Sequence, residues 1–516
     1  MSDLPSGWVE ATLSAVTTIN PVADKKSIAL EAWVNFVPMP AVGAETGRID
    51  VSEQRRFAKV KTGYTPFLEN DVLFAKITPC MENGKMAVVP KLPHLFGFGS
   101  TEFHVLRCPE GVLPEFVYLH VSSLKFRYDA EHNMTGAVGQ KRVPEPYLAQ
   151  TAFPLPPTNE QRRIMGKVES LFTELDKGEE SLRAARARAG LYRQSLLKYA
   201  FEGHLTADWR AANPDKLETP EILLARIQVE RDTRYKQALD DWQIDLEKWR
   251  DAGEQGKKPA KPKRQNDFVT LSHEVVVELP QVPEKWGYSK LANLGDLGRG
   301  KSKHRPRNDP RLLGGPYPLI QTGDVKSAGR IIREYTQSYT EFGLSQSKLW
   351  PKGTLCITIA ANIAETAFLG FDSCFPDSVV GFSSFEEMIS PFYIELFIKG
   401  VRQRIEAYAP ATAQKNINLT TLEELVIPLC SPAEQAEIVS RLEAKLSTLD
   451  ALEVQIEAQL ARSKALRQSI LKQAFAGKLV AQDPSDEPAS ELLKRIQAEK
   501  AATSKPTRKK KAAHAS

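Results

Sequence analysis

The chain has 516 residues, which is enough for several domains that each bury a hydrophobic core. Its hydrophobic content of 42%, charged content of 26% and formal net charge of +5 are ordinary for a globular protein, so composition alone does not establish nucleic-acid binding. The five cysteines include no CxxC pair, no apolar run reaches the ~18 residues of a membrane span, and the first residues do not resemble a signal peptide. These features argue against a zinc site and a membrane protein, and they predict a reduced, cytoplasmic setting.

Residues 1–157 are predicted to form a mixed α/β domain. Short apolar runs such as 71–77 are bounded by Pro, Gly and Asn, which is typical of strands joined by turns, and Pro114 begins a predicted helix. The segment 76–85 follows a predicted strand and ends in an Asn-Gly turn. Polar loop residues held by a sheet are frequent binding residues, although a plain hairpin turn explains the same letters. The candidate DNA contacts of this loop are Lys76, Thr78, Glu82, Asn83 and Lys85.

A long helix is predicted over residues 159–202. Thr158 or Asn159 can cap its start, and Gly203 can adopt the left-handed conformation that ends a helix. Apolar residues recur at alternating spacings of four and three, which predicts a seam against another helix. These residues are Val168, Phe172, Leu175, Leu182 and Leu196.

The centre of the chain is rich in charge. Residues 219–250 are predicted to form a charged helix, and residues 256–264 form a basic, Pro-containing linker. A second basic run, 505–511, lies in the C-terminal tail and is expected to be disordered. Both basic runs can contact DNA phosphates, but a solvated segment is the favoured interpretation of such charge blocks.

Residues 280–430 are again predicted to be mixed α/β, with a helix that begins at Pro391. The letters from Gly295 to Ser302 match the phosphate-binding P-loop. That site requires a helix that begins at the lysine, so that its N-terminal amides face the phosphates. Pro306 and Pro310 cannot lie inside such a helix, so the nucleotide-binding interpretation is rejected.

The same stretch is a candidate DNA-binding loop, because cations crowd into a Gly- and Pro-rich segment that can follow a phosphate backbone. Its arginines have the geometry to pair with guanine. An ordinary basic surface loop is the alternative. The candidate contacts are Arg299, Lys301, Lys303, Arg305 and Arg307.

A second long helix is predicted over residues 433–476, because residues 414–479 repeat residues 140–205 at a constant offset of 274 without a gap. Roughly a third of the paired positions are identical, far above chance for unrelated helices. We expect the two helices to pack antiparallel, with Leu175 and Leu449 in the seam. The alternative is one long helix in each of two separate bundles. The repeat opens with polar residues that contact DNA or set a turn, namely Gln140, Lys141, Gln414, Lys415 and Asn416.

Recognisable catalytic motifs are absent from the sequence. It contains no Asn-Pro-Pro-Tyr or Asp-Pro-Pro-Tyr motif for adenine methylation, no HExxH, and no Glu-x-Lys spacing after Pro214-Asp215 or Pro376-Asp377. The duplicated frame and the two dissimilar inserts instead suggest a protein that holds two different readers.

This organisation resembles the specificity subunit of type I restriction-modification systems. The resemblance rests on the motifs Pro-Leu-Pro-Pro-Thr-Asn-Glu-Gln at 154–161 and Pro-Leu-Cys-Ser-Pro-Ala-Glu-Gln at 428–435, each followed by a long helix, and on the ending Phe-Ala-Gly-Lys-Leu-Val at 475–480. Cys430 departs from the pattern, since Pro156 stands at that place in the first copy. The resemblance covers nearly the whole chain and is specific in the repeated frame.

The resemblance implies an α+β fold with two α/β target-recognition domains, joined by two long helices that form an antiparallel coiled coil with pseudo-twofold symmetry. Each domain would read one half of a split site in double-stranded DNA. Two modification subunits would bring S-adenosylmethionine and methylate adenine, and two restriction subunits would use ATP and magnesium. The chain itself would have no catalytic residues, metal or cofactor.

The predicted domain limits follow from these elements. They are 1–157 for target-recognition domain 1, 158–255 for a central helical region, 256–279 for a basic linker, 280–430 for target-recognition domain 2, 431–500 for a C-terminal helical region and 501–516 for a disordered basic tail. Two other functions stay open on the residues alone. They are a coiled-coil scaffold without DNA readout and a stand-alone DNA methyltransferase or nuclease.

Overall fold

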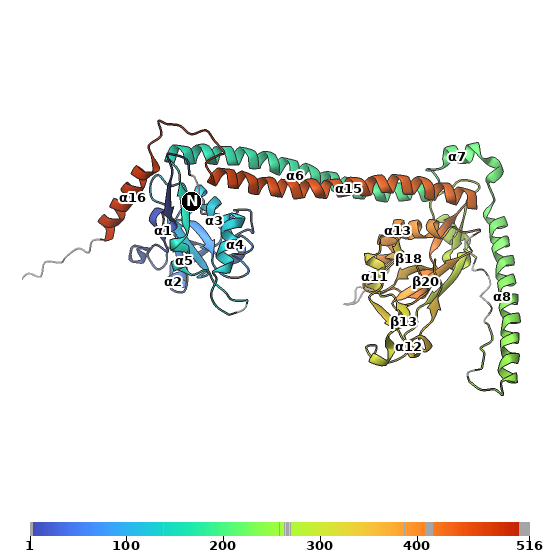
Figure 1. Cartoon of the computed structure of the whole chain (residues 1–516). Helices are drawn as coiled ribbons and strands as arrows, with labels where there is room; N and C mark the ends of the chain where they lie inside the picture. The colour runs from blue at the N-terminus through green and yellow to red at the C-terminus, as the bar shows by residue number, and fades with distance from the viewer. Residues whose placement is uncertain are drawn as a thin grey trace, which may run out of the picture. The chain divides into compact units, whose positions relative to one another are not determined.

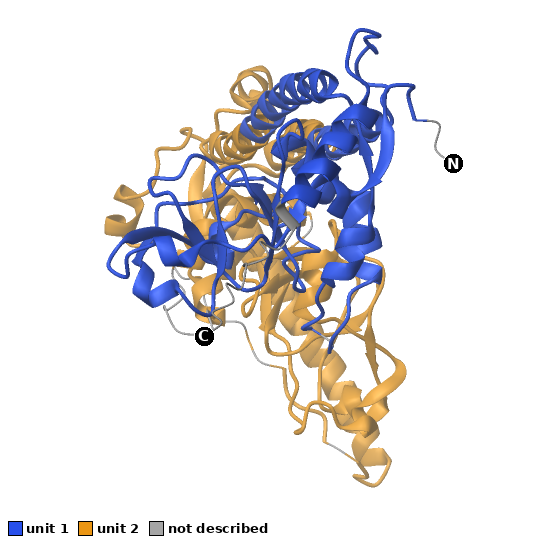
Figure 2. Cartoon of the chain, turned by 90° about the vertical axis from the view of Figure 1, so that its left-hand side faces the viewer, with its two compact units in different colours: residues 1–184, 456–516 blue, residues 185–455 orange. Residues whose placement is uncertain are grey.

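The computed structural model describes residues 4–137, 139–256, 258–262, 264, 268, 270–385, 387–407 and 416–504. The chain divides into two compact units, Met1–Ala184 with Ile456–Ser516 and Ala185–Gln455 (Figure 2). Each unit holds one mixed α/β domain and one part of each long helix. Gln414, Lys415 and the basic run 505–511 lie outside the described residues.

The two predicted long helices are confirmed as α6 (Thr158–Phe201) and α15 (Pro432–Phe475), which lie side by side (Figure 1). Gly203 and Gly477 follow them with φ of +81° and +65°. In the first copy the Gly203 N–H donates to the Ala200 carbonyl and the His204 N–H to the Tyr199 carbonyl, and the second copy repeats both bonds. This is the Schellman ending that a left-handed glycine permits.

The helix starts differ from the prediction. Thr158 is the first helical residue and its hydroxyl donates to the Gly111 carbonyl, while the Asn159 amide oxygen accepts from Arg162. In the second copy Ser431 precedes the helix and its hydroxyl accepts from the Glu434 N–H. The Thr158 hydroxyl is therefore used to fix the helix to a neighbouring loop rather than to cap it.

Antiparallel packing of the helices is confirmed within each unit. In the first unit Glu179 and Asp176 on α6 contact Ser463 and Arg467 on α15, so the residue number rises on one helix as it falls on the other. In the second unit Arg193 contacts Asp450, and the Leu205 carbonyl, just beyond α6, accepts from Arg441 on α15. Leu449 is buried, as predicted, whereas Leu175 is half-buried.

The first unit builds its α/β domain from three small sheets. A pair of strands is formed by β1 (Val9–Thr12) and β10 (Ala152–Leu155). A four-stranded sheet has the order β2 (Thr18–Ile19), β9 (Phe103–Arg107), β6 (Val72–Ala75), β7 (Met86–Val88). A second has the order β4 (Gln54–Arg56), β3 (Trp33–Val37), β8 (Gly97–Gly99), β5 (Thr65–Phe67). Its shorter helices are α1 (Leu13–Val16), α2 (Phe57–Val60), α3 (Pro114–Ser122), α4 (Leu124–His132), α5 (Glu145–Gln150) and α16 (Ala489–Ser504).

The second unit has the same kind of strand pair, β11 (Gly287–Lys290) with β21 (Val426–Leu429), and its larger sheets repeat the strand order and pairing directions of the first unit, with one strand added. One has the order β12 (Gly295–Arg299), β20 (Val379–Ser384), β17 (Leu355–Thr358), β18 (Thr366–Leu369), β14 (Ile331–Ile332). The other has the order β15 (Gln337–Tyr339), β13 (Leu313–Leu319), β19 (Ser373–Cys374), β16 (Leu349–Trp350). Its other helices are α7 (Ala207–Ala212), α8 (Pro220–Asp251), α9 (His273–Val277), α10 (Leu291–Leu294), α11 (Thr322–Ser327), α12 (Glu341–Ser345), α13 (Pro391–Ala407) and α14 (Leu419–Glu423).

The repeated Glu-Gln dipeptide ties each long helix to its α/β domain. The buried Gln161 amide accepts from the Leu113 N–H at 2.9 Å and donates to the Pro156 carbonyl at 3.0 Å. Gln435 makes the same pair of bonds with the Ser390 N–H and the Cys430 carbonyl. A buried amide that is satisfied on both sides fixes the orientation of the domain on the helix, which explains why the motif occurs in both copies.

The opening motif of each half also has a structural use. Trp286 donates its indole N–H to the buried Glu434 carboxylate at 2.8 Å. Pro283 packs against Gly203 in the second unit, and Pro5 packs against Gly477 in the first. Each Pro-x-x-Trp sequence therefore closes against the end of a long helix, and only glycine leaves room for the proline ring.

Candidate nucleic-acid interface

The predicted loop 76–85 of the first unit connects β6 to β7 as an ordered turn. The Thr78 hydroxyl donates to Glu82 at 3.0 Å, and the Lys85 ammonium donates to the Met39 carbonyl at 3.2 Å. Asn83 is exposed, and Gly84 follows it with φ of +62°. The loop thus presents Asn83 to solvent, while three other polar candidates partly serve to hold its shape.

The structure brings the first copy of the Gln-Lys segment next to this loop. The Thr78 N–H donates to the Lys141 carbonyl at 3.0 Å, and the Val143 N–H donates to the Lys76 carbonyl at 2.8 Å. Gln140 and Lys141 are exposed. Two sets of candidates that lie far apart in the sequence therefore form one polar surface.

An ion pair that the sequence did not reveal supports this surface. Arg142 pairs with Glu102 at 2.8 Å, and its hydrogen bonds hold the pKa of the Glu102 carboxyl below its usual range. Lys76 lies close by. Burial lowers the pKa of its ammonium, and the negative charge of Glu102 offsets part of this effect. Adjacent loops in the fold, rather than any motif, bring Arg142 and Glu102 together.

The basic loop of the second unit begins at Arg299, the last residue of β12. Arg299 donates to the Asp377 carbonyl, and Arg307 pairs with the Asp377 carboxylate at 2.7 Å. The Arg305 guanidinium donates to the Ser302 carbonyl at 2.6 Å. These three arginines are exposed but have partners within the loop and its neighbouring turn.

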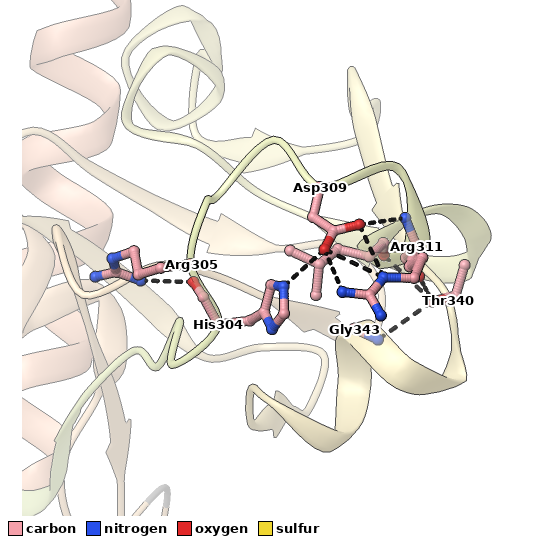
Figure 3. A network of polar contacts seen from close by, with 7 residues as sticks. His304, Arg305, Asp309, Arg311, Thr340 and Gly343 are labelled. Atoms are coloured by element: carbon pink, nitrogen blue, oxygen red, sulfur yellow. Dashed lines mark hydrogen bonds and ion pairs between the residues drawn. The ribbon is translucent and has the colours of Figure 1, made fainter.

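A second polar cluster fixes the far end of this loop (Figure 3). The Asp309 carboxylate accepts from His304 at 2.8 Å and from Arg311 at 2.7 Å, and these bonds hold the pKa of Asp309 well below its usual range. Thr340 donates its hydroxyl to the Arg311 carbonyl at 2.6 Å. Lys301 and Lys303 remain exposed on the same loop. The loop therefore has a defined shape with two lysines displayed to solvent.

The rejection of the P-loop is confirmed. Gly295–Arg299 forms β12, which pairs antiparallel with β20, and residues 301–309 contain no helix. The N-terminal helix amides that a nucleotide phosphate requires are therefore missing from this loop.

Of the candidates from the second copy of the repeat, Asn416 is described. It is exposed and forms a β-bridge with Ala360, just after β17.

None of the described helices combines the length and the apolar character that crossing a membrane requires. Across the ranges that the structure covers, no three His, Cys, Asp or Glu side chains are placed to hold a metal ion.

The specificity subunits of two Escherichia coli type I restriction enzymes are similar to this chain. That of EcoEI is 37% identical over 179 residues, which are 34% of this chain and 30% of that protein. That of EcoKI, from strain K12, is 24% identical over 533 residues and covers 98% of this chain and 99% of its own. This chain thus matches less than a third of the length of the EcoEI subunit, but nearly all of the EcoKI subunit.

Solved structures share the fold. A structure that describes complex assembly and conformational transition of a type I restriction-modification system has a TM-score of 0.67 at 20% identity, covering 92% of this chain and 99% of its own. The HsdS subunit of Thermoanaerobacter tengcongensis has a TM-score of 0.53 at 18% identity, covering 92% and 98%. The family described as type I restriction modification DNA specificity domain matches residues 5–182 and 283–462. Because these two matches span most of the chain and each begins at a Pro-x-x-Trp motif, the chain belongs to the family of type I restriction-modification specificity subunits.

Proposed function

We propose that this chain reads a split DNA target, with each α/β domain contacting one half of the site in double-stranded DNA. The observation that supports this proposal best is the contrast between the repeated segments, which hold the domains in the same way, and the inserts between them, which differ. Gln161 and Gln435 anchor the two domains by equivalent bonds, and the sheets repeat one strand order apart from the added β14, whereas the inserts differ in sequence and in the length of the loop after β6 and after β17. Identical mounting of domains with unlike sequences and loops is what a reader of two different half-sites needs.

The exposed cations and amides supply the chemistry for such reading. Lys141, Lys301 and Lys303 can neutralise phosphates, which gives affinity without sequence preference. Asn83 and Gln140 can pair with base edges, and amides favour adenine. Under this proposal Arg305 and Arg307 exchange their internal partners for DNA when the complex forms.

The proposal assigns catalysis to other subunits. Two modification subunits would bind S-adenosylmethionine and methylate adenine, and two restriction subunits would use ATP and magnesium. The long helices offer apolar surface on which such subunits can dock, since exposed apolar side chains otherwise mark interaction sites. These exposed side chains are Leu191, Tyr192 and Tyr199 on α6, and Leu452, Val454 and Leu466 on α15.

An insert swap tests the proposal. Residues 287–413, the insert between Trp286 and Gln414, would be replaced by the corresponding insert of a related specificity subunit, and the chain would be assembled with its modification subunits. Sequencing of methylated adenines should then show a change in one half of the target, with the other half and the spacer retained. A change in both halves, or an unchanged target in a complex that still methylates, would contradict the proposal. A scaffold without DNA readout predicts the unchanged target.

A further inference from the structure

The second unit contains a loop that corresponds in its contacts to loop 76–85 of the first. In the first unit the Val143 N–H donates to the Lys76 carbonyl at 2.8 Å, directly after β6. In the second unit the Ile417 N–H donates to the Ile359 carbonyl at 2.9 Å, directly after β17. The β-bridge between Ile77 and Arg142 has its counterpart between Ala360 and Asn416.

The strands around the two loops confirm this correspondence. β6 leads through residues 76–85 into the antiparallel β7, and β17 leads through residues 359–365 into the antiparallel β18. The two loops differ in length and share no sequence pattern, so the sequence alone did not reveal that they are equivalent. The basic loop, in contrast, follows β12, the edge strand on the other side of β20.

The basic loop and residues 359–365 nevertheless leave the five-stranded sheet at the same end of its strands, because β12 and β17 both run antiparallel to β20. Arg299 at the end of β12 and Ile357 near the end of β17 both pair with Val380 of β20. The Gly300 N–H donates to the Val379 carbonyl and the Ile359 N–H to the Ser378 carbonyl, each at 2.9 Å. The two loops therefore begin two strand spacings apart, or about 10 Å. One DNA groove and its adjacent backbone span this distance, so both loops can contact the same stretch of DNA.

Residues 359–365 are held in one conformation by a buried hydroxyl. Thr358 is buried, its hydroxyl donates to the Asn362 carbonyl, and it accepts from the Glu365 N–H at 3.0 Å. Ala361 and Ala364 have φ of +64° and +57°. The left-handed region is unfavourable for alanine because its Cβ approaches the following carbonyl oxygen, so the shape is maintained against a local preference.

The side chains on this loop match a base edge. Asn362 is half-buried, and its amide oxygen accepts from the exposed Lys326 ammonium of α11 at 3.3 Å. Asn416 is exposed at the Ala360 bridge. An asparagine amide offers one donor and one acceptor side by side, which is the pattern that pairs with adenine in the major groove. A lysine beside it can contact the adjacent phosphate.

We propose that residues 359–365, with Asn362 as the base-reading side chain and with Lys326 and Asn416 beside it, form the reading loop of the second half-site. Lys301 and Lys303 of the basic loop then contact the DNA backbone at the same end of the sheet. The proposal rests on the proposed function and deepens it, because it transfers base recognition in this domain from the basic arginines to an amide on another loop.

The test uses the chain assembled with its modification subunits. Asn362→Ala should weaken binding to the native target by about 5–150-fold, the loss expected for one bidentate base contact. Methylation should extend to sites that differ at one position of a single half-site. Lys326→Ala should flatten the log–log salt dependence of binding by about one unit and leave the methylated sequence unchanged. Lys352→Ala is the matched control, because Lys352 is exposed at the opposite end of β17.

Three outcomes separate the alternatives. Wild-type affinity and methylation pattern in both Asn362→Ala and Asn362→Gln would overturn the reading-loop inference, while a successful insert swap would leave the proposed function intact. Equal weakening on every DNA sequence, together with a lower unfolding temperature, would also overturn it, because Asn362 would then be structural. Failure of the insert swap itself would remove the proposed function and this inference with it.

Discussion

Arg193 and Arg467 make the same contact from opposite copies of the repeat. The Arg193 guanidinium lies 2.5 Å from the Asp450 carboxylate, and the Arg467 guanidinium lies 2.6 Å from the Asp176 carboxylate. Arg467 and Asp450 are the equivalents of Arg193 and Asp176 at the offset of 274. The arginine of each copy therefore contacts the aspartate of the other copy. This reciprocity is the mark of a self-complementary, antiparallel interface. Glu179 occupies the place between Leu175 and Leu182 where the apolar spacing calls for another apolar residue, and its contact with Arg467 explains the exception.

A double-mutant cycle between Glu179 and Arg467 should show coupling. Glu179 is only 15% exposed, so its pair is screened less than a typical surface pair, and we expect a coupling of about 0.5–1.5 kcal/mol in the free energy of unfolding. Denaturant unfolding of the full chain measures it. Arg183 is the control, because it pairs with Glu179 within one helix while 69% exposed. A coupling with Arg183 as large as that with Arg467 would contradict the prediction.

Gln161→Ala should destabilise the chain by about 2–4 kcal/mol. The substitution leaves the Leu113 N–H and the Pro156 carbonyl without their buried partner, and unsatisfied buried groups cost about 1–3 kcal/mol each. Thermal unfolding measures the effect. Gln194→Ala is the control within the same helix, because Gln194 is exposed and should change stability by no more than about 0.5 kcal/mol. Equal effects of the two variants would show that Gln161 does not anchor the domain.

Two glycine-to-alanine changes on either side of the end of α6 should have opposite effects. Gly203 has φ of +81°, and a Cβ there would lie 2.4 Å from the Pro283 ring, so Gly203→Ala should destabilise the chain by more than about 1 kcal/mol. Gly190 lies inside the helix with no atom within 4 Å of an added Cβ, so Gly190→Ala should stabilise it by about 0.5–1 kcal/mol. Equilibrium unfolding in urea checks both signs.

His120 should make the chain sensitive to mild acid. The His120 ring packs against Phe475, and in the second unit a phenylalanine, Phe397, packs in the same way against Phe201. Burial lowers the pKa of the His120 imidazole from 6.5 to about 4. Because the folded-state pKa lies below the unfolded value, the stabilisation is present above pH ~6.5 and is lost as the pH falls toward ~4. The loss is on the order of 3 kcal/mol at most. His120→Phe should flatten the pH dependence of the unfolding free energy in this window, and an unchanged slope would contradict the assignment.

Lys301→Ala distinguishes the two interpretations of the basic loop. With β12 in place of a P-loop, the isolated chain should bind no ATP before or after the change. In the assembled methyltransferase the variant should flatten the log–log salt dependence of DNA binding by up to about one unit, the value for one phosphate contact. Calorimetric titration with ATP and filter binding at several salt concentrations measure the two effects. ATP affinity that is lost in Lys301→Ala would overturn the DNA interpretation.

The repeated frame could be predicted because its physics is local. The spacing of apolar residues identified the first long helix and Gly203 marked its end, since helix periodicity and termination depend on residues within a few turns. The repeat at an offset of 274 then identified the second helix, with Gly477 at the equivalent place. The two starts were less predictable. Thr158 looks like a cap in the sequence, but the Gly111 carbonyl from a distant loop takes its hydroxyl.

The candidate site shows the same division. Polar loops after predicted strands were correctly recognised as loops, because Pro, Gly and Asn determine turns locally. Sequence alone also established the duplication, the unlike inserts and the absence of known catalytic motifs. Only the tertiary structure placed Lys141 beside Thr78, paired Arg142 with Glu102, and brought Asn362 to the same end of the sheet as Lys301. These relationships depend on strand order and register, which pairing between segments far apart in the chain decides and which no local pattern of residues records.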